Sequence, residues 1–433
     1  MGKKRLLIRG ARVVDPANVV DRMADILIEE GEISKIESPK PRAQILEDIE
    51  VIEAQGKIVL PGLIDMHVHL RQPGGEDKET ILSGCEAAAA GGFTAMACMP
   101  NTHPPVDTPK LVKWIISQAE EAKARVYPIA AITEGRRGEA LSDMARLLEA
   151  GAVAFSDDGD PVGNPQLMLS ALRVAKQLDA LIISHAEEKA LTQGGQMNEG
   201  RVSRALGLKG IPAVAEYVGV ARDIALAEYV GAKLHIAHLS TAGAVELVRQ
   251  AKRRGAKITA ETAPHYFTLT EEQVKVSGTN AKMNPPLRTL EDVEAIKEGL
   301  ADGTIDVIAS DHAPHTVHEK ALPFCQAPFG IIGLETTLGL VLTHLVAPRV
   351  ISLSEAAAMM STNPARILGI RGGEIKAGDK ANLTIIDPEL EWKVEVGQFR
   401  SKSRNSPFQG WRLKGKAIMT IVEGKLWLPN PPE

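Results

Sequence analysis

An eightfold alternation of short apolar runs with helical patterns, between residues 58 and 367, constrains the fold of this chain more than any other feature. The apolar runs are nearly continuous, which is typical of parallel strands covered by helices on both faces. Strands are expected at 63–68, 93–98, 126–132, 152–156, 180–184, 233–237, 256–260 and 305–309, and helices at 76–90, 109–124, 164–178, 212–230, 241–254 and 289–302. Eight consecutive units predict an α/β fold, a (β/α)8 TIM barrel. A doubly wound open sheet, the main alternative, does not explain eight units, and no G-x-G-x-x-G follows the first strand.

The two ends of the chain carry strand patterns of a different kind. Short strands are expected at 5–8 and 383–386, and hairpins at 26–36 and 416–427 that turn near Glu30-Gly31 and Glu423-Gly424. We predict that residues 1–57 and 368–433 combine in one small β-sandwich domain, and that residues 58–367 form the barrel. Two unrelated hairpins on one core are the alternative.

Composition and charge restrict the class of protein. With 44% hydrophobic residues, the 433-residue chain is not expected to be disordered. The net charge is −5 and no basic stripe is present, so no nucleic-acid partner is expected. No apolar run is long enough for a membrane helix, and the first residues lack the pattern of a secretory signal. Cys85, Cys98 and Cys325 are too few and too scattered for a disulfide framework, so we expect a soluble, cytoplasmic protein.

Histidine and acidic side chains follow the expected barrel strands at their carboxyl ends. The carboxyl ends of all strands in such a barrel open on one face, so these residues are expected to share one site. They are His67 and His69 after the first strand, Asp158 after the fourth, His185 after the fifth, His238 after the sixth and Asp311 after the eighth. His67 and His69 are two residues apart and therefore point to the same side of a strand. Imidazole nitrogens with carboxylate oxygens suit Zn²⁺, although each histidine alone would more simply be a hydrogen-bonded core residue.

Other histidines are weaker candidates for ligands. His235 lies within the sixth strand, on the side opposite to His238, and is expected to pack in the core. His265 follows a strand, but a structural role is favoured over a ligand role. His312 is expected to point away from the site, and His318 to lie in a loop.

Several motifs resemble those of a known family. Residues 61–71 (PGLIDMHVHLR) resemble the opening motif of the amidohydrolase superfamily, and residues 91–94 (GGFT) with 99–102 (MPNT) resemble the cyclic amidohydrolases. Similar to class I dihydroorotases are residues 155–159 (FSDDG), 284–288 (NPPLR), 310–315 (SDHAPH), 329–335 (FGIIGLE) and 402–408 (KSRNSPF). The resemblance covers essentially the whole chain. It implies the reversible, zinc-dependent cyclisation of N-carbamoyl-L-aspartate to L-dihydroorotate, a step of de novo pyrimidine (UMP) biosynthesis.

The same resemblance implies roles for individual residues. His67 and His69 would bind a first zinc, and His185 and His238 a second. Asp158 would bridge the two ions, at a position where hydantoinases carry a carboxylated lysine. Asp311 would be both a metal ligand and the residue that transfers the proton, while zinc activates water at neutral pH. The implied substrate contacts are His69, Arg71, Asn101, Asn284, His315 and the backbone of Phe329 and Gly330. Gln72 departs from the Asp or Glu that the family usually has there, but it matches no ligand position.

The sequence leaves some properties open. One or two zinc ions per subunit both fit the residues, and a homodimer or a complex with an aspartate carbamoyltransferase is compatible with the resemblance. Residues 315–329 follow the last strand, contain two prolines and have no helical period. They predict a loop that brings His315 onto the substrate and is mobile without it.

Two alternative functions are compatible with parts of this pattern. A hydantoinase or allantoinase would share the barrel and the metal pair. Asp158 in place of a lysine argues against a hydantoinase, and Arg71 with Asn101 favours a substrate that carries a carboxylate. A catalytically silent scaffold would have lost metal ligands, whereas all six ligand positions are filled here.

Overall fold

Eight parallel strands pair in the order β15-β14-β13-β10-β9-β8-β7-β6 in the computed structural model, which describes residues 5–39 and 49–428. They are β6 Leu63–Val68, β7 Phe93–Cys98, β8 Arg125–Ala130, β9 Ala154–Phe155, β10 Ile182–Ser184, β13 Leu234–Ile236, β14 Ile258–Thr262 and β15 Val307–Ile308. A parallel bridge between Val68 and His312 joins the first strand to the segment after the last. The predicted (β/α)8 barrel is therefore confirmed, and every expected strand contains or overlaps an observed one.

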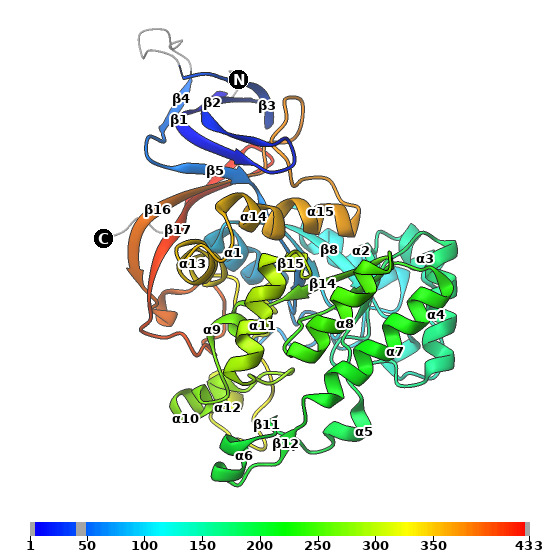
Figure 1. Cartoon of the computed structure of the whole chain (residues 1–433). Helices are drawn as coiled ribbons and strands as arrows, with labels where there is room; N and C mark the ends of the chain where they lie inside the picture. Colours follow the sequence, from blue (N-terminus) through cyan, green and yellow to red (C-terminus); the bar gives the residue numbers. More distant parts are fainter. Residues whose placement is uncertain (1–4, 40–48, 429–433) are drawn as a thin grey trace.

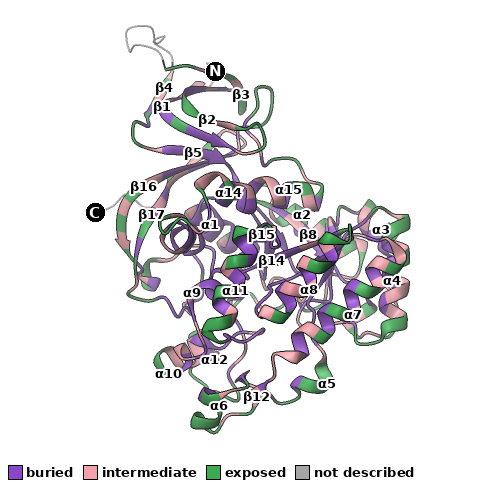
Figure 2. Ribbon diagram, viewed as in Figure 1, coloured by how far each residue is buried: buried purple, intermediate pink, exposed green. Residues whose placement is uncertain are grey.

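The helices between these strands begin at polar caps. The main ones are α1 Ile81–Gly91, α2 Pro109–Gln118, α4 Pro165–Gln177, α7 Val214–Val230, α8 Ala242–Arg253 and α11 Leu290–Ala301, with a shorter α3 at Met144–Glu149. The side chains of Thr80, Thr108 and Asn164 accept hydrogen bonds from backbone N–H groups of the first turn that no helical carbonyl can reach. The first helix was expected from residue 76, but the cap at Thr80 delays its start. These helices surround the barrel, and each has an exposed face that points outward (Figure 2).

Short elements that the sequence did not predict extend the loops at the carboxyl ends of the strands. They are α5 Lys189–Thr192, β11 Met197–Asn198, α6 Arg201–Leu206 and β12 Gly210–Ile211 after β10, and α9 Pro264–Thr268 with α10 Gln273–Ser277 after β14. After β15 comes α12 Val317–Lys320, and α13 Thr337–Val341, α14 Leu353–Ala357 and α15 Asn363–Leu368 follow. In Figure 1, α5, α6, α10 and α12 lie at the end of the molecule farthest from β1–β4.

The two ends of the chain combine, as predicted, and their strands pair in one mixed sheet. Its order is β18-β17-β16-β5-β1-β2-β3, and β4 also pairs with β1. The strands are β1 Arg5–Asp15, β2 Val20–Glu29, β3 Glu32–Glu37, β4 Glu50–Glu53, β5 Ile58–Pro61, β16 Leu383–Lys393, β17 Arg412–Val422 and β18 Lys425–Trp427. Glu30-Gly31 and Glu423-Gly424 turn the two hairpins with positive φ at both residues, 55° and 83° in the first and 49° and 77° in the second, the geometry that matches the twist of a hairpin.

The terminal sheet is joined to the barrel through β5, which pairs with β1 and β16 and runs directly into β6. Thr384 and Thr420 donate hydrogen bonds to the carbonyls of Gly92 and Ala89, at 2.6 and 2.7 Å. These contacts are made where α1 ends and β7 begins, so the sheet covers the amino end of the barrel and leaves the carboxyl end open. The boundaries expected at residues 57/58 and 367/368 stay predictions. Within the described ranges, no helix combines the length and the hydropathy that a membrane crossing requires.

Candidate active site

The side chains that follow the barrel strands converge at the carboxyl end of the barrel. Nε2 of His67 lies 3.4 Å from Oδ1 of Asp158 and 3.6 Å from Oδ1 of Asp311. Nε2 of His69 lies 3.1 Å from the same oxygen of Asp311. The first, fourth and eighth strands thus bring two imidazoles and two carboxylates into one cluster.

His185 and His238 approach the cluster from β10 and β13. Oδ1 of Asp158 lies 3.4 Å from Nδ1 of His185 and 3.5 Å from Nε2 of His238, and these two nitrogens are 2.9 Å apart. One oxygen of Asp158 is therefore shared by His67, His185 and His238. All of these side chains are buried.

The cluster has the atoms that a divalent cation requires. Nε2 of His67 and Oδ1 of Asp158 are buried and have no hydrogen-bond partner of their own, an arrangement that is costly unless another group completes it. Candidate ligand atoms fall into two groups, His67 with Asp158 and His238, and His67 with His69 and Asp311. Nitrogen and carboxylate donors of this kind fit a metal ion such as Zn²⁺. His67 belongs to both groups, whereas the resemblance had paired it only with His69.

The electrostatics of the cluster depend on its imidazoles. Burial alone would raise the pKa of Asp158, but the neighbouring imidazoles of His67, His185 and His238 hold it well below its usual range. For Asp311, burial is likewise outweighed by the hydrogen bond from His69 and the nearby His67, so its pKa is also lowered. Both carboxylates are therefore anionic at neutral pH and available to a cation.

Two further carboxylates, which the sequence analysis did not identify, support the cluster. Glu261, near the end of β14, places Oε1 2.5 Å from Nδ1 of His67. Asp65 accepts hydrogen bonds from the backbone N–H of His67 and, across the closing seam of the barrel, of Ser310, at 3.1 Å for each. The alternation of side chains along a strand could have identified Asp65, because Asp65 lies on the same strand face as His67 and His69. Glu261 could have been found by the same strand-end rule that identified Asp158.

The backbone changes direction where three of the site residues enter. Arg71, His238 and Asp311 have φ of 60°, 35° and 48°, in the left-handed region that residues other than glycine seldom adopt. Each follows a barrel strand. Such conformations cluster at functional sites, since the surrounding structure must maintain them.

The candidate substrate residues surround the cluster. Nδ1 of His69 is 2.9 Å from Oδ1 of Asn101, and Nδ2 of Asn284 is 3.4 Å from Nε2 of His185. Nδ2 of Asn284 also donates to Glu187 at 3.2 Å, another carboxylate that the sequence analysis missed.

Arg71 and His315 lie side by side near the same opening. Nη2 of Arg71 is 3.3 Å from Nε2 of His315, and Nε of Arg71 donates to the carbonyl of Pro314 at 3.1 Å. The carbonyl of Phe329 lies 2.8 Å from Nε2 of His315. The N–H and the carbonyl of Gly330 are both hydrogen bonded within the protein. The structure thus brings the predicted contacts together, while their roles toward a substrate stay predictions.

The weaker histidines are largely engaged within the protein. His312 faces Glu79, with Nε2 3.3 Å from a carboxylate oxygen, and its Nδ1 accepts from the N–H of Gly333. His265 packs on the ring of Tyr266, and burial lowers its pKa to about 4. His235 is buried as predicted, but Nε2 also lies 3.3 Å from Oε2 of Glu261.

Residues 315–329 are more ordered in their contacts than the sequence suggested. They contain the helix α12, capped by Thr316, and His318 lies in it. Nζ of Lys320 donates to the carbonyls of Pro328 and Gly330 at 3.0 and 2.9 Å, and Nζ of Lys282 donates to two further loop carbonyls. The expectation of a segment without helix was wrong because the cap and the lysine contacts hold a short turn that has no hydrophobic period. Mobility in the absence of substrate stays a prediction.

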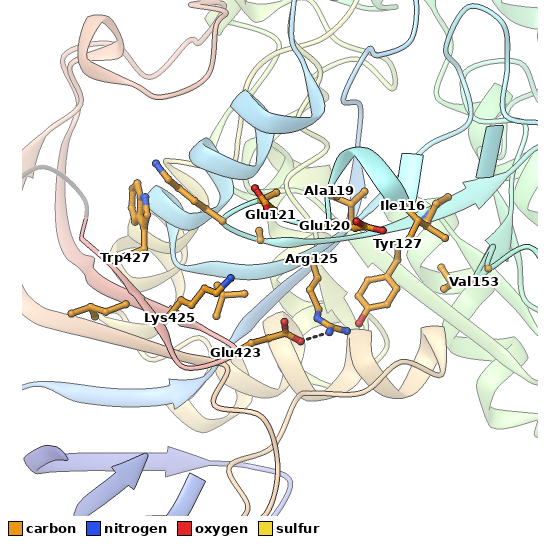
Figure 3. A pocket seen from close by; sticks show the side chains of 18 residues that line it. Ile116, Ala119, Glu120, Glu121, Arg125, Tyr127, Val153, Glu423, Lys425 and Trp427 are labelled. Carbon is orange, nitrogen blue, oxygen red and sulfur yellow. Dashed lines mark ion pairs between the residues drawn. The ribbon is translucent and has the colours of Figure 1, made fainter. Parts of the chain in front are cut away.

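A separate cavity of about 600 Å³ opens at the other end of the barrel (Figure 3). It lies beside the start of β8 and the hairpin of β17 and β18, and Tyr127, Lys425 and Trp427 line it. Arg125 and Glu423 form an ion pair across it. None of the candidate active-site residues lines this cavity.

Comparisons with known proteins agree with the geometry. Residues 56–244 match the family described as Dihydro-orotase-like, and residues 207–427 match the Amidohydrolase family. The chain is 53% identical over 422 residues to a dihydroorotase of Geobacter metallireducens, an alignment that covers 97% of this chain and 99% of the relative. It is also 53% identical to a dihydroorotase of Pelotomaculum thermopropionicum, over 98% of each chain. Among solved structures, the L-hydantoinase from Arthrobacter aurescens is similar with a TM-score of 0.88, at 26% identity over 99% of this chain and 96% of that one.

Proposed function

The chain belongs to the dihydroorotase family of the amidohydrolases, and from this membership we propose that it interconverts N-carbamoyl-L-aspartate and L-dihydroorotate in de novo pyrimidine biosynthesis. The observation that carries this proposal is full-length identity of 53% to dihydroorotases, combined with two candidate ligand groups that contain five of the six expected ligands, all except His185. A hydantoinase shares the fold at only 26% identity, so it is the weaker candidate.

The metal is Zn²⁺ in this proposal, held by His67, His69, Asp158, His185, His238 and Asp311. Support comes from the donor set and from the buried, unpartnered atoms of His67 and Asp158. When bound, the ion supplies a Lewis acid that activates water and polarises the attacked carbonyl. Two candidate groups that share His67 are compatible with one ion or with two.

Asp311 moves the proton in the proposed reaction. In the hydrolytic direction, a carboxylate oxygen of Asp311 accepts a proton from the attacking water and returns it to the ring nitrogen that leaves. The pKa of Asp311 is lowered because His69 and His67 outweigh burial, and this carboxylate is therefore anionic at neutral pH. In the cyclising direction the same transfers run in reverse, and water is lost.

Arg71 is the proposed partner of the substrate carboxylate. Burial lowers its pKa to about 10, so the guanidinium stays charged at neutral pH. Among the described residues, no Asp or Glu forms an ion pair with it, and its Nε donates to the carbonyl of Pro314. A half-buried guanidinium that forms no ion pair with a carboxylate and lies beside a metal cluster is suited to an anionic ligand. Asn101, Asn284, His69, His315 and the backbone of Phe329 and Gly330 complete the proposed contacts.

A substrate comparison tests the proposal. Turnover of dihydroorotate, dihydrouracil and allantoin should be compared in the metal-loaded protein. We expect dihydroorotate to be preferred strongly, and Arg71→Met to abolish that preference because only dihydroorotate carries a ring carboxylate. Preference for dihydrouracil would support a hydantoinase, and no turnover with no bound metal would support a silent scaffold. A cytoplasmic location, a homodimer and a complex with an aspartate carbamoyltransferase stay predictions from the resemblance.

A further inference from the structure

We propose that Glu261 is a positioning residue for the metal: its buried negative charge orients His67 and strengthens the hold of the cluster on the ion. Glu261 acts as the centre of a row that we call the Glu261 network, formed by Thr259, His235, Glu261 and His67. The inference rests on the metal site proposed above, and it adds residues that touch neither metal nor substrate.

The contacts of the Glu261 network connect Thr259, through His235 and Glu261, to the proposed metal ligand His67. Oγ1 of Thr259 lies 2.8 Å from Nδ1 of His235, and Nε2 of His235 lies 3.3 Å from Oε2 of Glu261. The other oxygen of Glu261 lies 2.5 Å from Nδ1 of His67. When Nδ1 of His67 donates to Glu261, the lone pair of Nε2 is left facing Asp158, at 3.4 Å.

Rigid strands hold each member of the network. Thr259 and Glu261 lie two residues apart on β14, and His235 pairs with Thr259 from the neighbouring strand β13. His67 belongs to β6, which is not a neighbour of β13 or β14 in the sheet. The network therefore crosses the interior of the barrel, and its geometry is set by three strands rather than by a loop.

The charge of Glu261 has no ordinary partner. Its side chain is 1% exposed, and no Lys or Arg among the described residues forms an ion pair with it. An isolated buried carboxylate is costly, and Glu261 is hydrogen bonded to the imidazole of His67 while Oε2, near His235, has no hydrogen-bond partner, so its charge is balanced mainly through His67. A cation beyond His67 provides that balance. A carboxylate behind a ligating histidine fixes the ring and raises its basicity as a ligand, and removing such a partner weakens metal binding about 10- to 100-fold.

Metal affinity tests the inference directly. Glutamine in Glu261→Gln keeps the size of the side chain and an oxygen that can accept from His67, but it removes the charge. The metal-depleted full chain should be dialysed against Zn²⁺ or Co²⁺ buffered by a chelator. We expect affinity to fall about 10- to 100-fold, with an altered visible absorption spectrum of the Co²⁺ form. At saturating metal, kcat should fall while KM for dihydroorotate stays nearly unchanged, since Glu261 does not touch the substrate.

Two further variants make the result decisive. Glu271→Gln is the matched control, because Glu271 is also a buried carboxylate, hydrogen bonded to Asn198 at 2.7 Å, but it contacts none of the proposed ligands. Its metal affinity should equal that of the wild type. Thr259→Val removes only the far end of the network, and it should weaken affinity by a smaller factor in the same direction; it decides the matter if Glu261→Gln does not fold.

The outcomes separate this inference from the proposed function. A wild type that binds metal and is active, together with Glu261→Gln of unchanged affinity and spectrum, overturns the role of Glu261 and leaves the enzyme proposal intact. A wild type without bound metal overturns both. Equal loss in Glu261→Gln and Glu271→Gln would show a general effect of removing buried charge and would also refute the inference.

Discussion

Replacement of Asp311 by asparagine is the sharpest test of the proposed chemistry. The asparagine side chain has nearly the same shape as the aspartate, but it could not accept a proton from water. General acid–base catalysis contributes about 10²- to 10⁴-fold, so the barrier should rise by about 2.7–5.5 kcal/mol. Loss of the anionic contacts to His69 and His67, at 3.1 and 3.6 Å, weakens metal binding in addition. We therefore expect kcat to fall at least about 100-fold even when metal is saturating.

The backbone at Asp311 makes asparagine the right substitution. Its φ is 48°, and the left-handed region costs most residues about 1–2 kcal/mol but is tolerated by Asp and Asn. Asp311→Asn should thus fold like the wild type, whereas Asp311→Ala should be less stable than Asp311→Asn by about that amount.

The assay pairs dihydroorotate hydrolysis with a metal count and a thermal melt on each variant. Retention of more than a tenth of wild-type kcat by Asp311→Asn, with metal bound, would refute the role of Asp311 in proton transfer. Equal stability of the alanine and asparagine variants would refute the backbone argument.

Three other predictions concern the substrate, the metal and the loop. Arg71→Met should raise KM for dihydroorotate by about 10- to 150-fold, because a hydrogen bond to a charged group contributes about 1.5–3 kcal/mol. Steady-state kinetics measures this change, and a fall in kcat at unchanged KM would contradict the prediction. Chelation should abolish activity and lower the melting temperature, because an ion at 100 times its Kd stabilises the folded state by about 2.7 kcal/mol. Readdition of Zn²⁺ should restore both the activity and the melting temperature. A melting temperature that does not change on chelation would contradict the proposed metal site. Burial lowers the pKa of Lys320 from 10.5 to about 7 in the folded protein. Between pH 7 and pH 10.5 the unfolded chain therefore binds more protons than the folded one, and the contribution of Lys320 to the free energy of unfolding rises with pH. Urea unfolding from pH 7 to 10 should show that rise in the wild type and a smaller one in Lys320→Met.

The barrel and its ligand cluster were accessible from the sequence because both depend on local patterns. Each barrel strand is an apolar run, and in a barrel each strand ends at the same rim, so His185 and Asp311 could be placed together without knowledge of any distance. The very short β9 and β15 were overestimated in length, since their pairing is set by neighbouring strands rather than by their own residues.

The contacts of the supporting residues could not be predicted in the same way. The strand-end rule could have placed Glu261 at the rim, but its contact with His67, on a strand that is distant in the sheet, is not revealed by any pattern along β14. Lys320 and Lys282 have the sequence pattern of ordinary charged surface residues, yet they donate hydrogen bonds to loop carbonyls that lie up to 45 positions away in sequence. Such contacts depend on the conformation of the loops, which the periodicity of apolar residues along the sequence does not predict.

The pairing of β5 with β16 has a consequence for synthesis of the chain. Ile58 lies opposite Ile386, so one edge of β5 stays open until the last part of the chain has been translated. At translation rates of about 5–20 residues per second, that interval is on the order of tens of seconds. An apolar strand edge left open for so long invites pairing with other nascent chains. Truncation before residue 383 should therefore yield aggregates rather than a smaller enzyme, because the last strands to leave the ribosome protect one of the first.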